Sequence, residues 1–224
     1  MDHLQLTSPN TGGLKTKENL GKIKEKLEQK WGILNNEKEI WRSLKNIEQP
    51  QIADFIWKMI HNRIKCGAFF RFILQWSDKE FCRCGATESI GHILTKCRVN
   101  GQKNLWKLIG KRWEKETKSK FKRSDMIDIM AIGSIRTKTG KMKEKRSADL
   151  YRTLVTTASW TIWKNRNRRI LDEILEDGAL QIKTWTKYIT EEIKQEALMR
   201  EMHKKKKMAK DKFEEKMDVK EKDS

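Results

Sequence analysis

The chain has 224 residues, enough for one ordinary domain or two small ones, and for a core that depends on neither disulfide nor metal. Lys and Arg outnumber Asp and Glu by 50 to 31, and the resulting charge of +19 predicts a polyanionic partner. Nucleic acid is the commonest such partner of a basic protein, ahead of a membrane surface. No long apolar run or signal-peptide pattern occurs, so we expect no membrane span and an intracellular protein, nuclear or cytoplasmic.

The N-terminal part predicts an arm followed by two helices. Residues 1–17 contain Gly and Pro without hydrophobic periodicity, which predicts a flexible arm. Apolar residues at steps of three and four then predict helices over 20–34 and 40–47. Pro50 must end the second of these helices at or before Gln49, because the residue before a proline disfavours helical backbone.

The strongest helical signal begins at Pro50 and runs over Ile52 to Lys65, with Gly67 after it. Its apolar residues fall on one face, and an aromatic run follows directly. We expect that face to pack on the run and so anchor the next segment. The aromatic run consists of Phe69, Phe70, Phe72 and Trp76.

The whole chain predicts a mostly α fold, a helical domain with an embedded Cys-Cys-His-Cys knuckle and long C-terminal helices, because no series of period-2 strands occurs. The expected order is a helical metal-binding domain over 18–116, a basic connector over 117–146 and a C-terminal helical region over 147–198. The last region begins with a long helix to about Glu176. Residues 199–224 are rich in charge and poor in apolar side chains, which predicts a disordered tail.

Three of the four cysteines and one histidine lie within sixteen residues, as Cys82, Cys84, His92 and Cys97. A close Cys pair on a turn, followed by His and Cys from a helix, can supply the four ligands of a tetrahedral zinc ion. Gly85 favours the turn, since glycine accepts positive φ. Cys97 can reach the metal if the helix ends just before it. The alternative is three ordinary thiols and a polar histidine.

This zinc would be closed and structural, because four protein ligands leave no open coordination position. The sequence contains no Gly-rich phosphate loop, HExxH, GxSxG or Tyr-x-Asp-Asp motif. Acidic residues lie mostly in Lys/Glu helices, where solvated charge pairs are their usual role. We therefore expect a protein that is not an enzyme and has no small-molecule substrate.

Three stretches resemble a known family: "FIWKMIHNRIKCGAFF", "CRCGATESIGHILTKC" and "NLWKLIGKRW". Together they are similar to the zinc-binding region that follows the reverse transcriptase in non-LTR retrotransposon polyproteins, particularly fungal ones. The resemblance covers roughly Glu39 to Leu171. It implies a zinc module that helps bind nucleic acid during target-primed reverse transcription, with ligands Cys82, Cys84, His92 and Cys97. Polymerase, endonuclease and RNase H cores are absent from this chain, so the resemblance implies a fragment, a decayed copy or a stand-alone derivative.

The first functional hypothesis is a non-catalytic, zinc-stabilised module that binds RNA or DNA. Lys and Arg near the knuckle and in "KNRNRR" would contact phosphates. The alternative is a helical protein-interaction scaffold braced by structural zinc, whose charge serves solubility. The predicted nucleic-acid contacts are Arg83, Lys96, Arg98, Lys103, Lys107, Lys164, Arg166, Arg168 and Arg169.

Overall fold

The computed structural model describes residues 10–99, 101–135 and 142–171, together with single positions between 186 and 208. The described residues form helices and no strand. One isolated antiparallel bridge joins Phe81 to Thr87. The prediction of a mostly α fold is therefore confirmed. None of the helices among these residues combines the length and the apolar character needed to cross a membrane.

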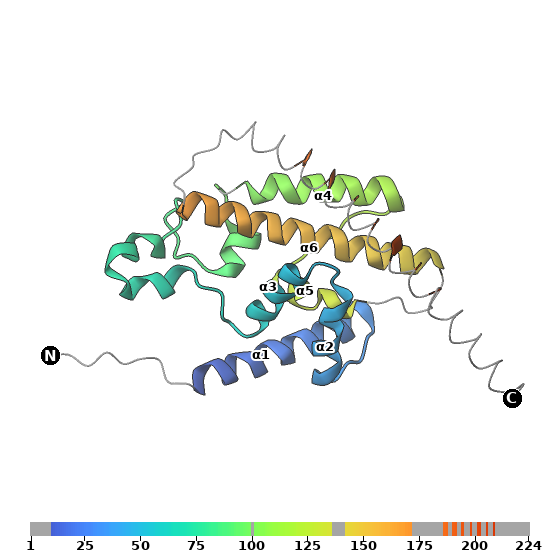
Figure 1. The fold of residues 1–224 in the computed structure, drawn as a ribbon, viewed down its shortest axis with the longest axis horizontal. Coiled ribbons are helices and arrows are strands. Elements are labelled where there is room, and N and C mark those ends of the chain that lie inside the picture. Colours follow the sequence, from blue (N-terminus) through green and yellow to red (C-terminus); the bar gives the residue numbers. More distant parts are fainter. Residues whose placement is uncertain are drawn as a thin grey trace, which may run out of the picture.

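One long helix, α6 (Met142–Leu171), runs through the middle of the molecule (Figure 1). α4 (Gln102–Thr117) lies against one side of it. The shorter helices α3 (Pro50–Ile60) and α5 (Met126–Met130) lie against the other side, and α1 (Asn10–Lys26) packs on both of them. The helices therefore form two layers around α6.

α1 begins earlier than the sequence predicts. Residues 10–17 are helical where the composition predicts a flexible arm, and residues 1–9 lie outside the described residues. The early turns of α1 are held by contacts that sequence periodicity does not reveal. Thr16 Oγ1 lies 3.0 Å from Nδ1 of His61, and Asn19 donates a hydrogen bond of 2.9 Å to the carbonyl of Ile60.

The next turns follow the predicted helices with changes of helix type. α1 continues as a π-helical turn, η1 (Leu27–Trp31), and stops at Gly32, whose φ of 60° is left-handed. α2 (Glu37–Ser43) begins with a capping box, in which the Asn36 side chain accepts from the backbone N–H of Glu39 and the Glu39 carboxylate accepts from the backbone N–H of Asn36. It continues as a short 3₁₀-helix, η2 (Leu44–Asn46).

α3 begins at Pro50 as predicted but stops before its predicted end at Lys65. Asn62 adopts a left-handed conformation with φ of 52°, through which a right-handed helix cannot continue. Asparagine is one of the few residues that tolerate this conformation. The apolar face is buried as predicted, through Ile52, Phe55, Ile56, Met59 and Ile60.

The aromatic run does not support α3, so that prediction is wrong. The ring of Phe55 instead lies 5.5 Å from that of Trp160 and 5.8 Å from that of Trp163, both on α6. Two 3₁₀-helices, η3 (Gly67–Phe72) and η4 (Leu74–Glu80), carry the run. We call residues 67–81 the aromatic lobe. Phe70 is its buried aromatic side chain, whereas the exposed ones are Phe69, Phe72, Trp76 and Phe81.

The predicted basic connector over 117–146 contains part of the core. α5 and a short 3₁₀-helix, η6 (Ile132–Ser134), lie within it, and the side chains of Ile129 and Ile135 are fully buried. Asp125 caps α5 through a capping box. Residues 136–141 lie outside the described residues. Residues 125–135 of the predicted connector are therefore part of the packed helical core.

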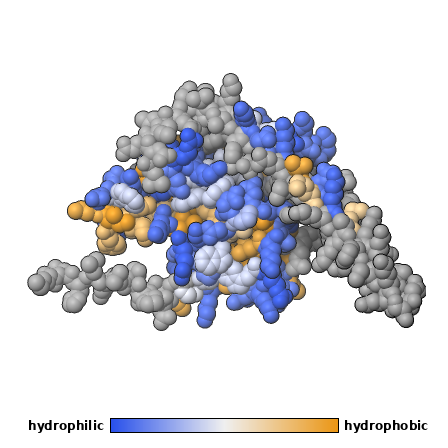
Figure 2. Space-filling model, in the orientation of Figure 1, coloured by the Kyte–Doolittle hydropathy of each residue, from blue (hydrophilic) through white to orange (hydrophobic). Residues whose placement is uncertain are grey.

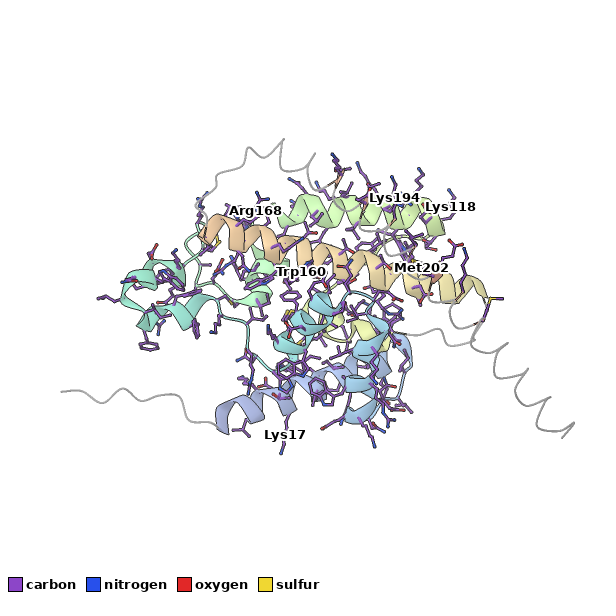
Figure 3. All side chains as sticks on the ribbon, in the orientation of Figure 1. Lys17, Lys118, Trp160, Arg168, Lys194 and Met202 are labelled. Atoms are coloured by element: carbon purple, nitrogen blue, oxygen red, sulfur yellow. The ribbon has the colours of Figure 1, made fainter. Side chains whose placement is uncertain are left out.

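α6 is buried on most of its circumference, although it carries many Ser and Thr side chains. The hydrogen bonds of their hydroxyl groups explain how these side chains can be buried. Thr153, Thr156 and Ser159 each donate a hydrogen bond of 2.8 to 3.0 Å to the carbonyl four residues earlier, which satisfies polar groups inside the core. The core is continuous from Leu20 to Ile162, so the predicted ranges before and after the connector share it. Figure 3 shows Trp160 of α6 directed toward the short helices.

α6 begins at Met142, five residues before the predicted start at Ser147, and is described to Leu171. Residues 172–185 of the predicted C-terminal helical region lie outside the described residues. Described positions between 186 and 208 are helical. Among them Lys205 pairs with Glu201 at 3.3 Å, an i,i+4 contact that supports a helix where the composition predicts a disordered tail.

Candidate metal centre

A tight turn brings Cys82 and Cys84 together. The bridge between Phe81 and Thr87 closes the turn, and the backbone N–H of Cys82 donates to the carbonyl of Ala86 at 2.9 Å. Gly85 donates to the carbonyl of Cys82 at 2.8 Å and has φ of 82°. The positive φ predicted for this glycine is confirmed, and it turns the chain back so that both sulfurs are presented on one side.

The other two ligands lie at the ends of a single wide helical turn, η5 (His92–Lys96): His92 begins it and Cys97 follows it directly. Ser89 caps it, since the Ser89 hydroxyl accepts a hydrogen bond of 3.1 Å from the backbone N–H of His92. Thr87 pairs with Phe81 in the bridge and lies before this turn. The N–H of Cys97 donates to the carbonyl of His92 at 2.8 Å, the i to i+5 bond of a π-turn.

This π-turn resolves the angular problem of the spacing. Five residues span about 140° beyond a full turn of an ideal α-helix, which would direct His92 and Cys97 to different sides. The wider turn brings them closer in direction, and the helix stops at Lys96, as the ligand spacing requires. Cys97 itself is extended, with φ of −62° and ψ of 133°.

The four ligand atoms converge. The sulfurs of Cys82 and Cys97 are 3.5 Å apart, Sγ of Cys84 lies 3.3 Å from Nε2 of His92, and all four atoms lie within 4.8 Å of one another. Neighbouring sulfurs around a tetrahedral zinc with bonds of about 2.3 Å would be about 3.8 Å apart. The cluster therefore has the dimensions of a metal site. A disulfide, at about 2.05 Å, does not describe the 3.5 Å separation.

The electrostatics of the cluster are uneven. Burial raises the pKa of the Cys82 thiol to about 12, whereas the backbone N–H of Ala86 lowers the pKa of the exposed Cys84 thiol. Burial lowers the pKa of Arg169, while Cys82 and Cys97 act in the opposite direction. Arg169 therefore places a positive charge beside the sulfurs. Three thiolates and one divalent cation carry a net charge of −1, which such an arginine would offset.

The knuckle, residues 82–97, packs on α4 and α6, and two hydrogen bonds from α4 hold its last turn. The indole N–H of Trp106 donates to the carbonyl of Leu94 at 2.8 Å, and the Gln102 amide donates to the carbonyl of Cys97 at 2.8 Å. Ile93 and Leu94 are buried beneath these contacts. The two hydrogen bonds fix the chain on either side of the last ligand.

Arg166 is a correction to the predicted nucleic-acid contacts. Its side chain is 2% exposed, and its Nε donates to a carboxylate oxygen of Glu88 at 2.9 Å. Its guanidinium also lies over the rings of Phe70 and Trp163, at 5.6 and 5.4 Å. This arginine joins α6 to the knuckle and has no surface with which to contact a phosphate.

The side chains of the other predicted nucleic-acid contacts differ in how exposed they are. Lys164 and Arg169 are half-buried, and the others are exposed. Figure 3 places Arg168 near the C-terminal end of α6, the end of the molecule at which α4 begins. We call the exposed set the basic face, although its contact with nucleic acid stays a prediction. The basic face comprises Arg83, Lys96, Arg98, Lys103, Lys107 and Arg168.

Several residues of the site region escape sequence reasoning. Glu88 and Gln102 are polar but 5% and 3% exposed. Arg166, 78 residues away, binds the Glu88 carboxylate, and Gln102 bonds both to the nearby Cys97 carbonyl and to Arg123, 21 residues away. Lys111 is exposed and continues the i,i+4 spacing of Lys103 and Lys107 along α4, a signal that the sequence does contain. Among the described residues, the Cys/His cluster is the one group of three or more His, Cys, Asp or Glu side chains whose ligand atoms converge.

No family model, curated protein or solved structure matches this chain. The geometry alone therefore carries the functional argument. It establishes a Cys₃His cluster that can hold a metal ion, embedded in a mostly α fold.

Proposed function

We propose that the chain is a non-catalytic nucleic-acid-binding module in which Cys82, Cys84, His92 and Cys97 hold one structural zinc ion. The observation that carries the proposal is the convergence of these four ligand atoms in a strongly basic protein. Thiolate and imidazole together suit zinc, whereas hard cations such as Mg²⁺ and Ca²⁺ prefer oxygen ligands. The resemblance to retrotransposon zinc-binding regions supports the same function.

The zinc would act by ordering the knuckle, which carries two members of the basic face and is followed directly by a third. Arg83 follows the first ligand directly, and Lys96 and Arg98 flank the last. A metal that fixes the ligands thus also fixes the backbone from which these cations project. Phosphate binding would then depend on metal loading, although no phosphate touches the metal.

Metal analysis of the purified chain tests the first half of this proposal. We expect one zinc per chain, lost in Cys84→Ser, and retained in Cys66→Ser because Cys66 lies outside the cluster. A stoichiometry well below one after refolding with zinc would contradict the zinc assignment.

Salt-dependent binding of labelled RNA and DNA tests the second half. Log K should fall against log salt with a slope of about −0.7 to −0.9 for each phosphate contacted. Reversing the charge of Lys103 and Lys107 should reduce the slope by about two phosphates. Reversing Lys17, an exposed lysine of α1 that is distant from the knuckle in Figure 3, should change it less.

A protein-interaction scaffold is the second candidate function, and one observation favours it. The aromatic lobe leaves Phe72 81% exposed and Leu74 93% exposed, and exposed apolar groups of this kind often mark protein interfaces. The scaffold predicts no salt-dependent binding of any nucleic acid by the zinc-loaded chain. The same titrations therefore separate the two functions.

A further inference from the structure

A groove of about 700 Å³ lies between the C-terminal end of α3 and the residues Glu88, Ser89 and Ile90 that precede η5. Its volume falls within the range of about 300 to 1,000 Å³ of pockets that hold small organic ligands. Trp57 and Phe69 contribute aromatic rings to its lining, and Ser89 and Ile90 contribute the knuckle side. None of the four metal ligands lines it, so the groove is separate from the metal centre.

The charge of the groove favours an anionic ligand. Arg63 and Lys65 are exposed in its lining. Glu88 is the acidic member of the described lining, and Arg166 binds its carboxylate with a hydrogen bond of 2.9 Å. The one carboxylate of the groove is therefore neutralised from inside the protein, while Arg63 and Lys65 remain at the surface. The third cation of the lining, Lys58, pairs with Asp54 at 2.6 Å.

The aromatic lobe continues the groove through Phe69. Residues three apart in a 3₁₀-helix lie on the same side, separated by about 6 Å along the axis, so Phe69 and Phe72 of η3 share one side. Their side chains are 45% and 81% exposed. Figure 2 shows hydrophobic surface at the end of the molecule where the lobe lies. The Nζ of Lys65 lies 5.2 Å from the centre of the Phe69 ring, which brings a cation beside an exposed aromatic face.

We propose that the groove and this side of η3 bind unpaired nucleotides of a single-stranded nucleic acid. Bases would stack on Phe69 and Phe72, and phosphates would contact Arg63 and Lys65. The inference rests on the proposed function and adds the strand state of the ligand and the residues that select it. Alternating rings and cations are the arrangement that binds single strands without sequence preference, because every base has a stacking face.

The same features argue against a purely apolar partner. A protein docking on Phe72 alone would need no cations, whereas here the rim of the groove carries Arg63 and Lys65. A duplex keeps the faces of its bases stacked inside the helix, so it exposes base edges and phosphates but no face on which a ring can stack. A single strand is the polyanion that presents both base faces and phosphates to this surface.

The test uses the zinc-loaded full chain and fluorescence anisotropy with a labelled pyrimidine 12-mer, as RNA and as DNA, and with a 12-base-pair duplex. Phe72→Ala should weaken binding of both single strands about 5- to 150-fold and leave duplex binding unchanged. Phe72→Trp should retain the affinity, because it keeps a stacking ring. Phe72→Leu should lose affinity as Phe72→Ala does, because it keeps apolar contact without an aromatic face. Comparing the RNA and DNA 12-mers shows which nucleic acid this surface prefers.

A matched control removes an equally exposed apolar side chain elsewhere. Leu34 is 79% exposed and lies between η1 and α2, so Leu34→Ala should leave both affinities unchanged. Because Phe72 is itself mostly exposed, its variants should keep the thermal stability of the parent chain, which circular dichroism checks. Charge reversal at Arg63 should reduce the slope of log K against log salt for single strands by an amount that corresponds to about one to two phosphate contacts.

The outcomes separate the two proposals. If the parent chain binds single strands and duplex, and Phe72→Ala binds single strands as tightly as the parent does, stacking on Phe72 is overturned. The proposed nucleic-acid-binding function then still stands. If Phe72→Leu keeps full affinity where Phe72→Ala loses it, the contact is apolar and the surface fits a protein partner better. If the zinc-loaded parent binds no nucleic acid, both proposals fail.

Discussion

The helical body and the segment over residues 67–97 are stabilised in different ways. In the body, side chains such as Ile23, Ile56 and Leu154 are fully buried in one continuous core. In the segment, Phe72 and Leu74 are exposed, and Ile93 and Leu94 are the side chains that reach the core. Specific polar contacts and the ligand cluster hold the rest of it. Many weak apolar contacts tolerate the loss of one member, whereas a few directed contacts do not. Single changes should therefore have sharper effects in the segment.

Removal of the proposed zinc ion should produce the largest effect and confine it to the segment. Structural zinc contributes about 10 to 16 kcal/mol of folding free energy in zinc-finger peptides, so its loss should release residues 82–97. Chelation, or Cys84→Ser, should abolish hydrogen-exchange protection there and preserve it in α3 and α6. Unchanged protection in the knuckle would show that metal does not hold it. Loss of protection throughout would show that the body depends on the metal as well.

Breaking the buried ion pair should have the next largest effect. Arg166→Met leaves the Glu88 carboxylate buried without its cation, which should cost about 3 to 5 kcal/mol in urea unfolding. The double variant Glu88→Gln with Arg166→Met should recover much of this loss, because it leaves no buried charge. Arg112→Met provides the matched control. Its pair with Glu116, at 3.0 Å, is exposed on both sides and should contribute under about 1 kcal/mol.

An equal effect of the buried and exposed variants would contradict the distinction drawn for this pair. It would mean that the Arg166 side chain is solvated in solution and available to phosphates. The prediction that Arg166 contacts nucleic acid, made from the basic stretch "KNRNRR", would then apply again.

The comparison also marks what sequence alone can predict. Apolar residues at steps of three and four predict α3 and α6, because the period of a helix is visible in the sequence of that helix alone. Pro50 predicts the start of α3, because its ring holds φ at a helical value. The spacing of the Cys and His ligands and the positive φ of Gly85 are equally local, since the turn and its ligands lie within sixteen residues. These predictions hold because neighbouring residues supply the whole cause.

Burial of individual side chains depends on partners elsewhere in the chain, and here sequence reasoning fails. Arg166 reads as a surface cation because its partner, Glu88, is 78 residues away. Phe72 reads as part of an anchoring run, yet nothing in the described chain covers it. Ile129 and Ile135 lie in an apolar stretch whose helices are too short to show a period, so the core within the connector is missed.

Gly67 joins the two regions and should tolerate no side chain. A Cβ on Gly67 would lie 1.7 Å from the carbonyl oxygen of Glu88, and its φ of 56° is left-handed. Backbone strain of this kind costs about 1 to 3 kcal/mol before the overlap is counted, so Gly67→Ala should destabilise the chain by about 3 kcal/mol. Gly91→Ala is the control, because a Cβ there meets nothing within 4 Å and the backbone is helical. It should be neutral or stabilising by up to about 1 kcal/mol.

Equal stability of the two alanine variants in urea unfolding would show that the lobe and the knuckle are not in the close contact described here. A Gly67→Ala variant that keeps body stability but loses protection in the lobe would sharpen the comparison. It would show that the segment can yield without the body.

The smallest predicted effect concerns Trp106, the contact that ties the knuckle to α4. Trp106→Phe keeps an aromatic ring but removes the indole N–H that donates to the carbonyl of Leu94 at 2.8 Å, leaving a buried acceptor without its donor. The loss should be about 1 to 2 kcal/mol in urea unfolding, together with faster exchange over η5. Trp31→Phe makes the same chemical change where the buried Nε1 has no hydrogen-bond partner among the described residues, so it removes an unsatisfied donor and should cost less. If Trp31→Phe proves the more destabilising of the two, ring volume and not the directed hydrogen bond decides the stability of each site. The knuckle would then rest on packing, as the body does.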